Sequence, residues 1–163
     1  MVDEDQLQSE EAQAFGCSPD YNVYTRKVNE KPVPPKNLRS AGLHLHWGYD
    51  NYNANTSLAI ISLCDLCIGV PSILIDTDTR RRSIYGKAGA FRLTSYGCEY
   101  RSLSSYMMKD VETLSRVWTG IEQVISFFNR GISNQDPDKV RECIDTCNQK
   151  LAKELICKYK LIL

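Results

Sequence analysis

The sequence lacks the motifs and the long apolar runs that would assign a function at once. Its 163 residues include only two histidines. No nucleophile elbow, phosphate-binding loop or dinucleotide fingerprint occurs. No apolar run approaches the roughly 20 residues of a membrane span, and the acidic N-terminus has no apolar segment behind it that would make it a secretory signal. These absences predict a protein with no cofactor, no signal peptide, no transmembrane segment and no enzymatic activity.

Cysteine is present but in an odd number. Seven cysteines in a chain without a secretory signal are typical of free thiols rather than of a disulfide framework. The sequence therefore predicts a reducing compartment.

Basic residues are missing from residues 1–14, which carry five acids: Asp3, Glu4, Asp5, Glu10 and Glu11. The rest of the chain therefore holds 20 bases against 15 acids. We expect residues 1–20 to form a disordered acidic arm and residues 21–163 to form a single α+β domain. The arm either screens the basic body from anionic partners or only keeps the chain soluble.

Hydrophobic periodicity predicts the elements of the domain. Leu43, Leu45 and Trp47 alternate with two histidines over residues 42–48, as in a half-buried strand. A helix is expected over 56–68, capped by Asn55 or Thr56 and ended by Gly69 and Pro71. Strands are expected over 72–76 and, after the turn at 76–79, over the basic stretch 80–93. The fold class is α+β: a small antiparallel sheet packed by one short helix and by a C-terminal antiparallel helical hairpin.

The hairpin is predicted from two apolar seams. In the first helix, over 106–130, the seam recurs at steps of three and four, with Trp118 and Ile125 in its middle. Its members are Met107, Val111, Leu114, Trp118, Ile121, Ile125 and Phe128. The second seam, over 137–159, consists of Val140, Cys143, Ile144, Cys147, Leu151, Leu155 and Tyr159. Both seams are expected to be buried.

Two histidines and two cysteines form the most suggestive metal-ligating set. His44, His46, Cys64 and Cys67 are residue types that bind zinc. Cys64 and Cys67, however, fall inside an apolar helix with no turn between them, which is typical of small core residues. The sequence therefore predicts no metal site.

The basic run gives the candidate binding site. Basic and aromatic side chains together suit RNA or an anionic membrane. The predicted nucleic-acid or anionic-lipid site consists of Arg80, Arg81, Arg82, Tyr85, Lys87 and Arg92. The alternatives are a kinase site at Ser83 and a solvated edge strand that uses charge to avoid pairing. Within the domain, the proline-rich segment 29–37 is either an extended linker or a docking peptide.

The order of elements over residues 43–93 resembles the central part of rhabdovirus matrix proteins, especially those of plant-infecting members. The resemblance is carried by Leu43–Trp47, by the helix ending at Cys67-Ile-Gly69, and by Arg81–Phe91. It implies a non-enzymatic virion protein of matrix type that self-associates and contacts the viral nucleocapsid or RNA, or peripherally an anionic membrane. It also implies a location in the virion and the host cytoplasm. The alternative is a small adaptor or RNA-binding accessory protein.

Overall fold

The computed structural model describes residues 9, 20–30, 41–50, 53–76 and 78–163. Most of the predicted acidic arm, and residues 31–37 of the proline-rich segment, lie outside the described residues. The predictions made for both therefore stay predictions.

A four-stranded antiparallel sheet forms one layer of the protein. Its strand order is β1-β3-β4-β2, so the central pair is β3 and β4. The strands are β1 (Tyr21–Asn22), β2 (Gly42–Gly48), β3 (Ala90–Thr94) and β4 (Gly97–Ser104). The strand predicted over 42–48 is confirmed, with Leu43, Leu45 and Trp47 packed against the core. The predicted strand over 80–93 shrinks to β3, and β4 was not predicted.

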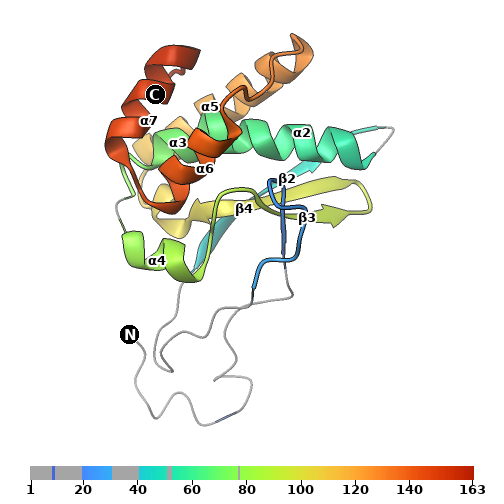
Figure 1. Ribbon diagram of the computed structural model, residues 1–163, viewed down its shortest axis with the longest axis horizontal. Coiled ribbons are helices and arrows are strands. Elements are labelled where there is room, and N and C mark those ends of the chain that lie inside the picture. Colours follow the sequence, from blue (N-terminus) through green and yellow to red (C-terminus); the bar gives the residue numbers. More distant parts are fainter. Residues whose placement is uncertain (1–8, 10–19, 31–40, 51–52, 77) are drawn as a thin grey trace.

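Helices form the second layer and gather on one side of the sheet, while the short helix α4 lies near one end of β4 (Figure 1). The helical elements are α2 (Ala54–Cys64), the π-helical η2 (Asp65–Gly69), α3 (Val70–Ser72), α4 (Thr79–Ile84), the 3-10 helix η3 (Ser105–Met108), α5 (Val111–Asn129), α6 (Pro137–Asp145) and α7 (Gln149–Tyr159). The helices α6 and α7 pack together, and the predicted α+β fold class is confirmed.

The central helical run begins and ends differently from the prediction. Asn53, not Asn55 or Thr56, caps it by accepting a hydrogen bond from the Thr56 N–H at 2.9 Å. The run then continues through Gly69 as a π-helix and ends at Ser72. Gly69 is needed for close packing rather than for a helix stop, because a Cβ atom there would lie 2.7 Å from the Tyr100 hydroxyl. The predicted strand over 72–76 is therefore wrong, and hydrogen-bonded turns follow Ser72.

The helical run Ala54–Ser72 has the length and composition of a membrane span. However, 61% of its apolar window is buried inside the protein. Ile61, Cys64 and Leu66 are completely buried in the hydrophobic core. The run is thus placed as a core helix of this fold.

Helix α5 turns a different face to the core from the one predicted. Its inner face is formed by Thr113, Val117, Gly120, Gln123, Val124 and Phe127. Gly120 fixes this orientation, because a Cβ atom there would lie 2.8 Å from Ile68 Cγ1 and 2.9 Å from the Cys67 carbonyl oxygen. The prediction that Trp118 and Ile125 are buried is wrong, since they are 63% and 48% exposed. The second predicted seam is confirmed at Val140, Cys143, Ile144, Leu151 and Leu155, all buried.

Asp65 is a completely buried carboxyl group between η2 and the sheet. The hydroxyls of Tyr100 and Tyr24 each donate a hydrogen bond to it at 2.8 Å. Burial raises the pKa of Asp65 to about 7, against an ordinary value of 3.8, although these two hydrogen bonds act in the opposite direction. Between about pH 4 and pH 7 the folded protein therefore retains a proton on Asp65 that the unfolded chain has already released.

This raised pKa predicts that Asp65 makes the fold less stable as the pH rises from about 4 to about 7, because the unfolded chain binds fewer protons there. The Asp65→Asn variant should not show this decrease. Between about pH 4 and pH 7 the free energy of unfolding should therefore fall by ~4 kcal/mol more in the wild type than in the variant. Urea denaturation at several pH values measures it. Asp138→Asn, at an exposed position in the first turn of α6, is the matched control and should keep the wild-type slope. Parallel curves for the wild type and Asp65→Asn would contradict the prediction.

Candidate active site

The face of the sheet opposite the helices carries a group of charged side chains, which we call the sheet-face cluster. It consists of His44, His46, Arg92, Glu99 and Arg101. Successive side chains of a strand point to opposite faces of the sheet, so these residues share one face. Tyr100, between Glu99 and Arg101, points to the other face and reaches Asp65 in η2. The antiparallel register places Glu99 directly opposite both His46 on β2 and Arg92 on β3.

Glu99 is the centre of the sheet-face cluster. Its Oε1 atom lies 2.8 Å from His44 Nδ1 and contacts Arg101 Nη1, while its Oε2 atom lies 3.9 Å from Arg92 Nη1. Glu99 and Arg101 are 6% and 1% exposed. Basic groups from β2, β3 and β4 thus surround the buried carboxylate. They compensate its charge, which is costly to remove from water without partners.

The hydrogen bonds around His44 form a chain of donors and acceptors. Arg101 Nη2 donates to the Tyr85 hydroxyl oxygen at 2.7 Å, and this hydroxyl lies 2.9 Å from His44 Nε2. If His44 carries its proton on Nδ1, facing Glu99, then Nε2 accepts the Tyr85 proton. Arg101 Nη1, which also lies 3.2 Å from His44 Nδ1, then has Glu99 Oε1 as its acceptor. Burial, followed by the charge of Arg101, lowers the pKa of His44, which favours this neutral form. Tyr85, His44 and Glu99 are thus arranged for proton transfer, with Glu99 orienting the imidazole.

A groove of about 440 Å³ opens where the segment 22–30 meets α4 and α6, and we call it the basic groove. Four basic and two acidic side chains line it, so its formal charge is +2. Its lining consists of Asn22, Thr25, Lys27, Val28, Asn29, Glu30, Arg82, Ser83, Lys87, Arg141 and Asp145. This excess of positive charge favours an anionic group such as a carboxylate or a phosphoryl group.

The basic groove and the sheet-face cluster are linked through Asp20. The side-chain amide of Asn29, in the wall of the groove, donates to Asp20 Oδ1 at 2.9 Å. Asp20 Oδ2 in turn lies 3.5 Å from Arg101 Nε. The segment 20–30 therefore contacts both sites, and it comes to the sheet because β1 pairs with β3.

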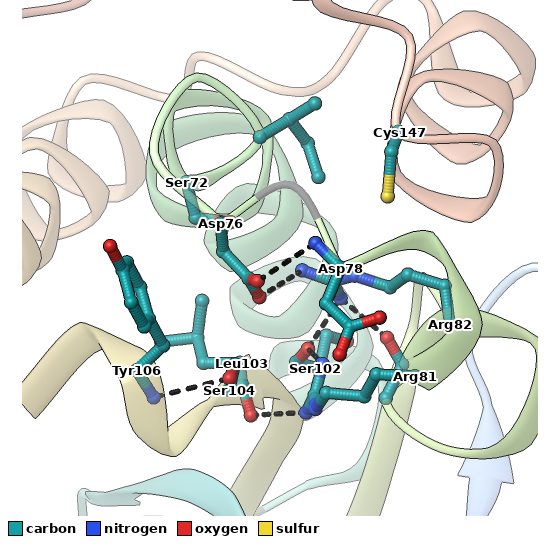
Figure 2. A network of polar contacts seen from close by, with 12 residues as sticks. Ser72, Asp76, Asp78, Arg81, Arg82, Ser102, Leu103, Ser104, Tyr106 and Cys147 are labelled. Carbon is teal, nitrogen blue, oxygen red and sulfur yellow. Dashed lines mark hydrogen bonds and ion pairs between the residues drawn. The ribbon is translucent and has the colours of Figure 1, made fainter.

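Behind the basic groove, Arg81 and Arg82 enter the protein and bind backbone carbonyl groups. Arg82 Nη1 donates to the carbonyl oxygens of Gly86 and Ser102, both at 2.5 Å, and its Nη2 lies 3.9 Å from Asp76 Oδ2 (Figure 2). Arg81 Nη2 donates to the Leu103 carbonyl oxygen at 2.5 Å. Burial lowers the pKa of the Arg81 guanidinium to about 10. These two arginines connect α4 to the end of β4.

The predicted binding residues do not lie on one basic strand. Arg80–Arg82 are helical, because the Asp78 side chain caps α4 by accepting from the Arg80 N–H at 3.1 Å. Only Arg80 of these three is exposed. Lys87 joins Arg82 at the basic groove, whereas Tyr85 and Arg92 lie at the sheet-face cluster. The structure therefore places two of the six predicted residues at each site, buries Arg81 against backbone carbonyl groups and leaves Arg80 exposed on α4.

Sequence reasoning missed Glu99, Arg101 and Asp20, and treated His44 only as a candidate metal ligand. The available signal was the alternation of polar residues with Cys98 and Tyr100 after the turn at 94–97. Cys64 and Cys67 lie in the core, as predicted for these two residues. Among the described residues there is no group of three or more metal-ligating side chains placed to hold an ion.

A protein-family model matches residues 33–126 and corrects the functional predictions. This model describes phage phiEco32-like COOH·NH2 ligases of type 2, not rhabdovirus matrix proteins. The predicted non-enzymatic matrix function and virion role are therefore wrong, since a ligase family indicates an enzyme. The alternative of an adaptor or RNA-binding accessory protein is overturned by the same finding.

The matched region includes β2, α2, α4, β3, β4 and most of α5, and with them all five members of the sheet-face cluster. No curated protein sequence and no solved structure matches the chain. The family match nevertheless covers more than half of the 163 residues. The chain therefore belongs to the phage phiEco32-like COOH·NH2 ligase-type 2 family.

Proposed function

We propose that this protein joins a carboxyl group to an amino group, with the Tyr85–His44–Glu99 chain and the basic groove as parts of its active site. The observation that carries the proposal is the coincidence of two findings. The chain belongs to a family described by this reaction, and the matched residues include the ordered chain Tyr85–His44–Glu99.

Amide formation at neutral pH faces two chemical obstacles. The carboxylate is a poor electrophile because an oxide anion is a poor leaving group, and the amine is protonated and not nucleophilic. A phosphoryl donor, such as a nucleoside triphosphate, removes the first obstacle. A carboxylate oxygen attacks the terminal phosphorus, the P–O bond to the nucleoside diphosphate breaks, and an acyl phosphate forms. The amine then attacks the acyl carbon, and the C–O bond to phosphate breaks. The enzyme must therefore bind anions and accept a proton.

The basic groove supplies the anion-binding part in this proposal. Lys27, Lys87 and Arg141 place three cationic groups in its lining, where they would hold a carboxylate or phosphoryl group. Arg82, which is buried behind this surface, adds a fixed positive charge that needs no reorganisation when an anion arrives.

The sheet-face cluster supplies the proton acceptor. The Tyr85 hydroxyl oxygen can accept a proton from the amine while Tyr85 passes its own proton to His44 Nε2, 2.9 Å away. The resulting imidazolium is stabilised by Glu99 at His44 Nδ1. The ammonium group first releases one proton to solvent and becomes the neutral amine. The second proton, which the nitrogen loses as the amide bond forms, ends on the imidazole.

The reaction is tested with hydroxylamine in place of the amine, since hydroxylamine converts an activated carboxylate into a coloured hydroxamate. The purified chain is incubated with the magnesium salt of a nucleoside triphosphate and a panel of carboxylic acids that includes amino acids and dicarboxylates. We expect hydroxamate to form with one class of acid, and only when the triphosphate is present. A folded protein that gives none with any acid would contradict the proposal.

A further inference from the structure

Helix α5 has an apolar face that is largely exposed in the described part of the protein, with only Ile121 half-buried against the core. Its residues are Val111, Leu114, Trp118, Ile121, Ile125 and Phe128, and we call them the α5 stripe. Five of them are exposed, from 40% at Phe128 to 81% at Val111. This face lies beside the inner one that packs through Gly120 onto η2. A contiguous exposed apolar patch that contains a tryptophan and a phenylalanine is typical of an interaction site.

The spacing of the α5 stripe is that of an α-helical coiled coil. The six residues are separated by steps of three, four, three, four and three, which is an uninterrupted a/d heptad pattern along the whole helix. None of the six is charged. Such a pattern is typical of a seam between two helices rather than of scattered surface residues.

We propose that the α5 stripe is a homodimer interface, in which α5 packs antiparallel against α5 of a second copy. The order of the residues is self-complementary about the helix centre. In this arrangement Trp118 meets Ile121 of the other copy, Leu114 meets Ile125, and Val111 meets Phe128. The smallest side chain thus lies opposite a large aromatic ring, and a two-fold axis brings identical surfaces together.

The helix dipole and the exposed area support a second copy as the occupant. Near the N-terminal end of α5, Asp110 and Glu112 are each paired within their own chain, with Lys109 at 3.7 Å and with Arg116 at 3.0 Å. Antiparallel packing places opposite helix-dipole ends together, whereas parallel packing would bring like ends together. The exposed apolar area of the α5 stripe is ~500 Å², so two copies would bury ~1,000 Å², the size at which specific interfaces begin.

The oligomeric state of the full chain tests the proposal by sedimentation velocity over a range of micromolar concentrations. We expect a reversible dimer that Trp118→Glu converts to a monomer. The matched control is Ser126→Glu, which adds the same charge at an exposed position of α5 outside the stripe, and it should stay dimeric. A wild-type chain that is monomeric throughout, or a Trp118→Glu variant that still dimerises, would overturn the interface.

Orientation is tested by paired charges. Leu114→Glu and Ile125→Lys should each abolish the dimer, and the double variant should restore it, because antiparallel packing brings the introduced carboxylate of one copy to the introduced ammonium group of the other. A parallel seam would bring like charges together in the double variant and leave it monomeric, which would overturn the antiparallel arrangement. Since both positions are exposed in the monomer, unchanged circular dichroism would show that the variants fold.

Discussion

Replacing His44 with glutamine is expected to lower hydroxamate formation by about 10²–10⁴-fold, the usual contribution of a positioned acid or base. His44 Nε2 lies 2.9 Å from the Tyr85 hydroxyl, and His44 Nδ1 lies 2.8 Å from Glu99. Glutamine keeps polar atoms in this space but cannot take up a proton at neutral pH. The loss should therefore appear in kcat, with little change in the KM of the carboxylic acid.

His46→Gln is the matched control for this experiment. His46 lies on the same strand and the same face, but it is exposed, and its Nδ1 atom contacts Tyr96 at 2.7 Å rather than Tyr85. Its replacement should leave kcat within a few-fold of the wild type. Equal losses in the two variants would contradict a specific role for His44, and a His44→Gln variant with full activity would remove His44 from the mechanism. Neither result would depend on the dimer interface.

Replacing Arg82 with methionine is expected to lower the free energy of unfolding by about 3–5 kcal/mol, the usual cost of removing one partner from a buried ion pair. The Arg82 side chain is 1% exposed and that of Asp76 is 5% exposed. The variant leaves the Asp76 carboxylate buried without its cation and removes the hydrogen bonds to the Gly86 and Ser102 carbonyl oxygens. Urea denaturation measures the change.

Arg80→Met is the matched control, because Arg80 is two residues away on the same helix and its side chain is 89% exposed. Its effect should stay within about 0.5 kcal/mol. A second variant, Arg82→Met with Asp76→Leu, removes both charges and should regain part of the lost stability, since an apolar pair does not leave a buried charge behind. If Arg82→Met and Arg80→Met were equally stable, the buried pair would not hold α4 in place.

The outcome at the two arginines explains why the basic run was taken for a strand. Arg81 and Arg82 were predicted to lie on an exposed strand, but they are helical and donate to the carbonyl groups of Ser102 and Leu103, about twenty residues later in the chain. Three consecutive arginines have the same local pattern whether they face solvent or carbonyl oxygens. The capping residue Asp78 was the one local sign that this segment is a helix and not a strand.

The same limit applies to the active-site residues. Tyr85 and Arg92 were selected from the sequence, but Glu99 and Arg101, which surround them, were not. These partners meet because β4 pairs with both β2 and β3 in one particular register. The register depends on side-chain packing across the sheet, and the strand that supplies it was missed. The enzyme class was excluded for lack of a known short motif, although the polar groups were present.

The sequence by itself determined the features that local periodicity sets. These are the strand 42–48 with its two faces, the apolar helix that contains Cys64 and Cys67, and the C-terminal seam of Val140 and Leu155. Only the tertiary structure decided which face of α5 is buried. The helix has two apolar faces, and the one that packs inward is the one that contains Gly120, because only a residue without a side chain fits against the Cys67 carbonyl and Ile68. Periodicity selects the face with the largest apolar residues, but packing selects the face that fits, and the difference leaves Trp118 exposed.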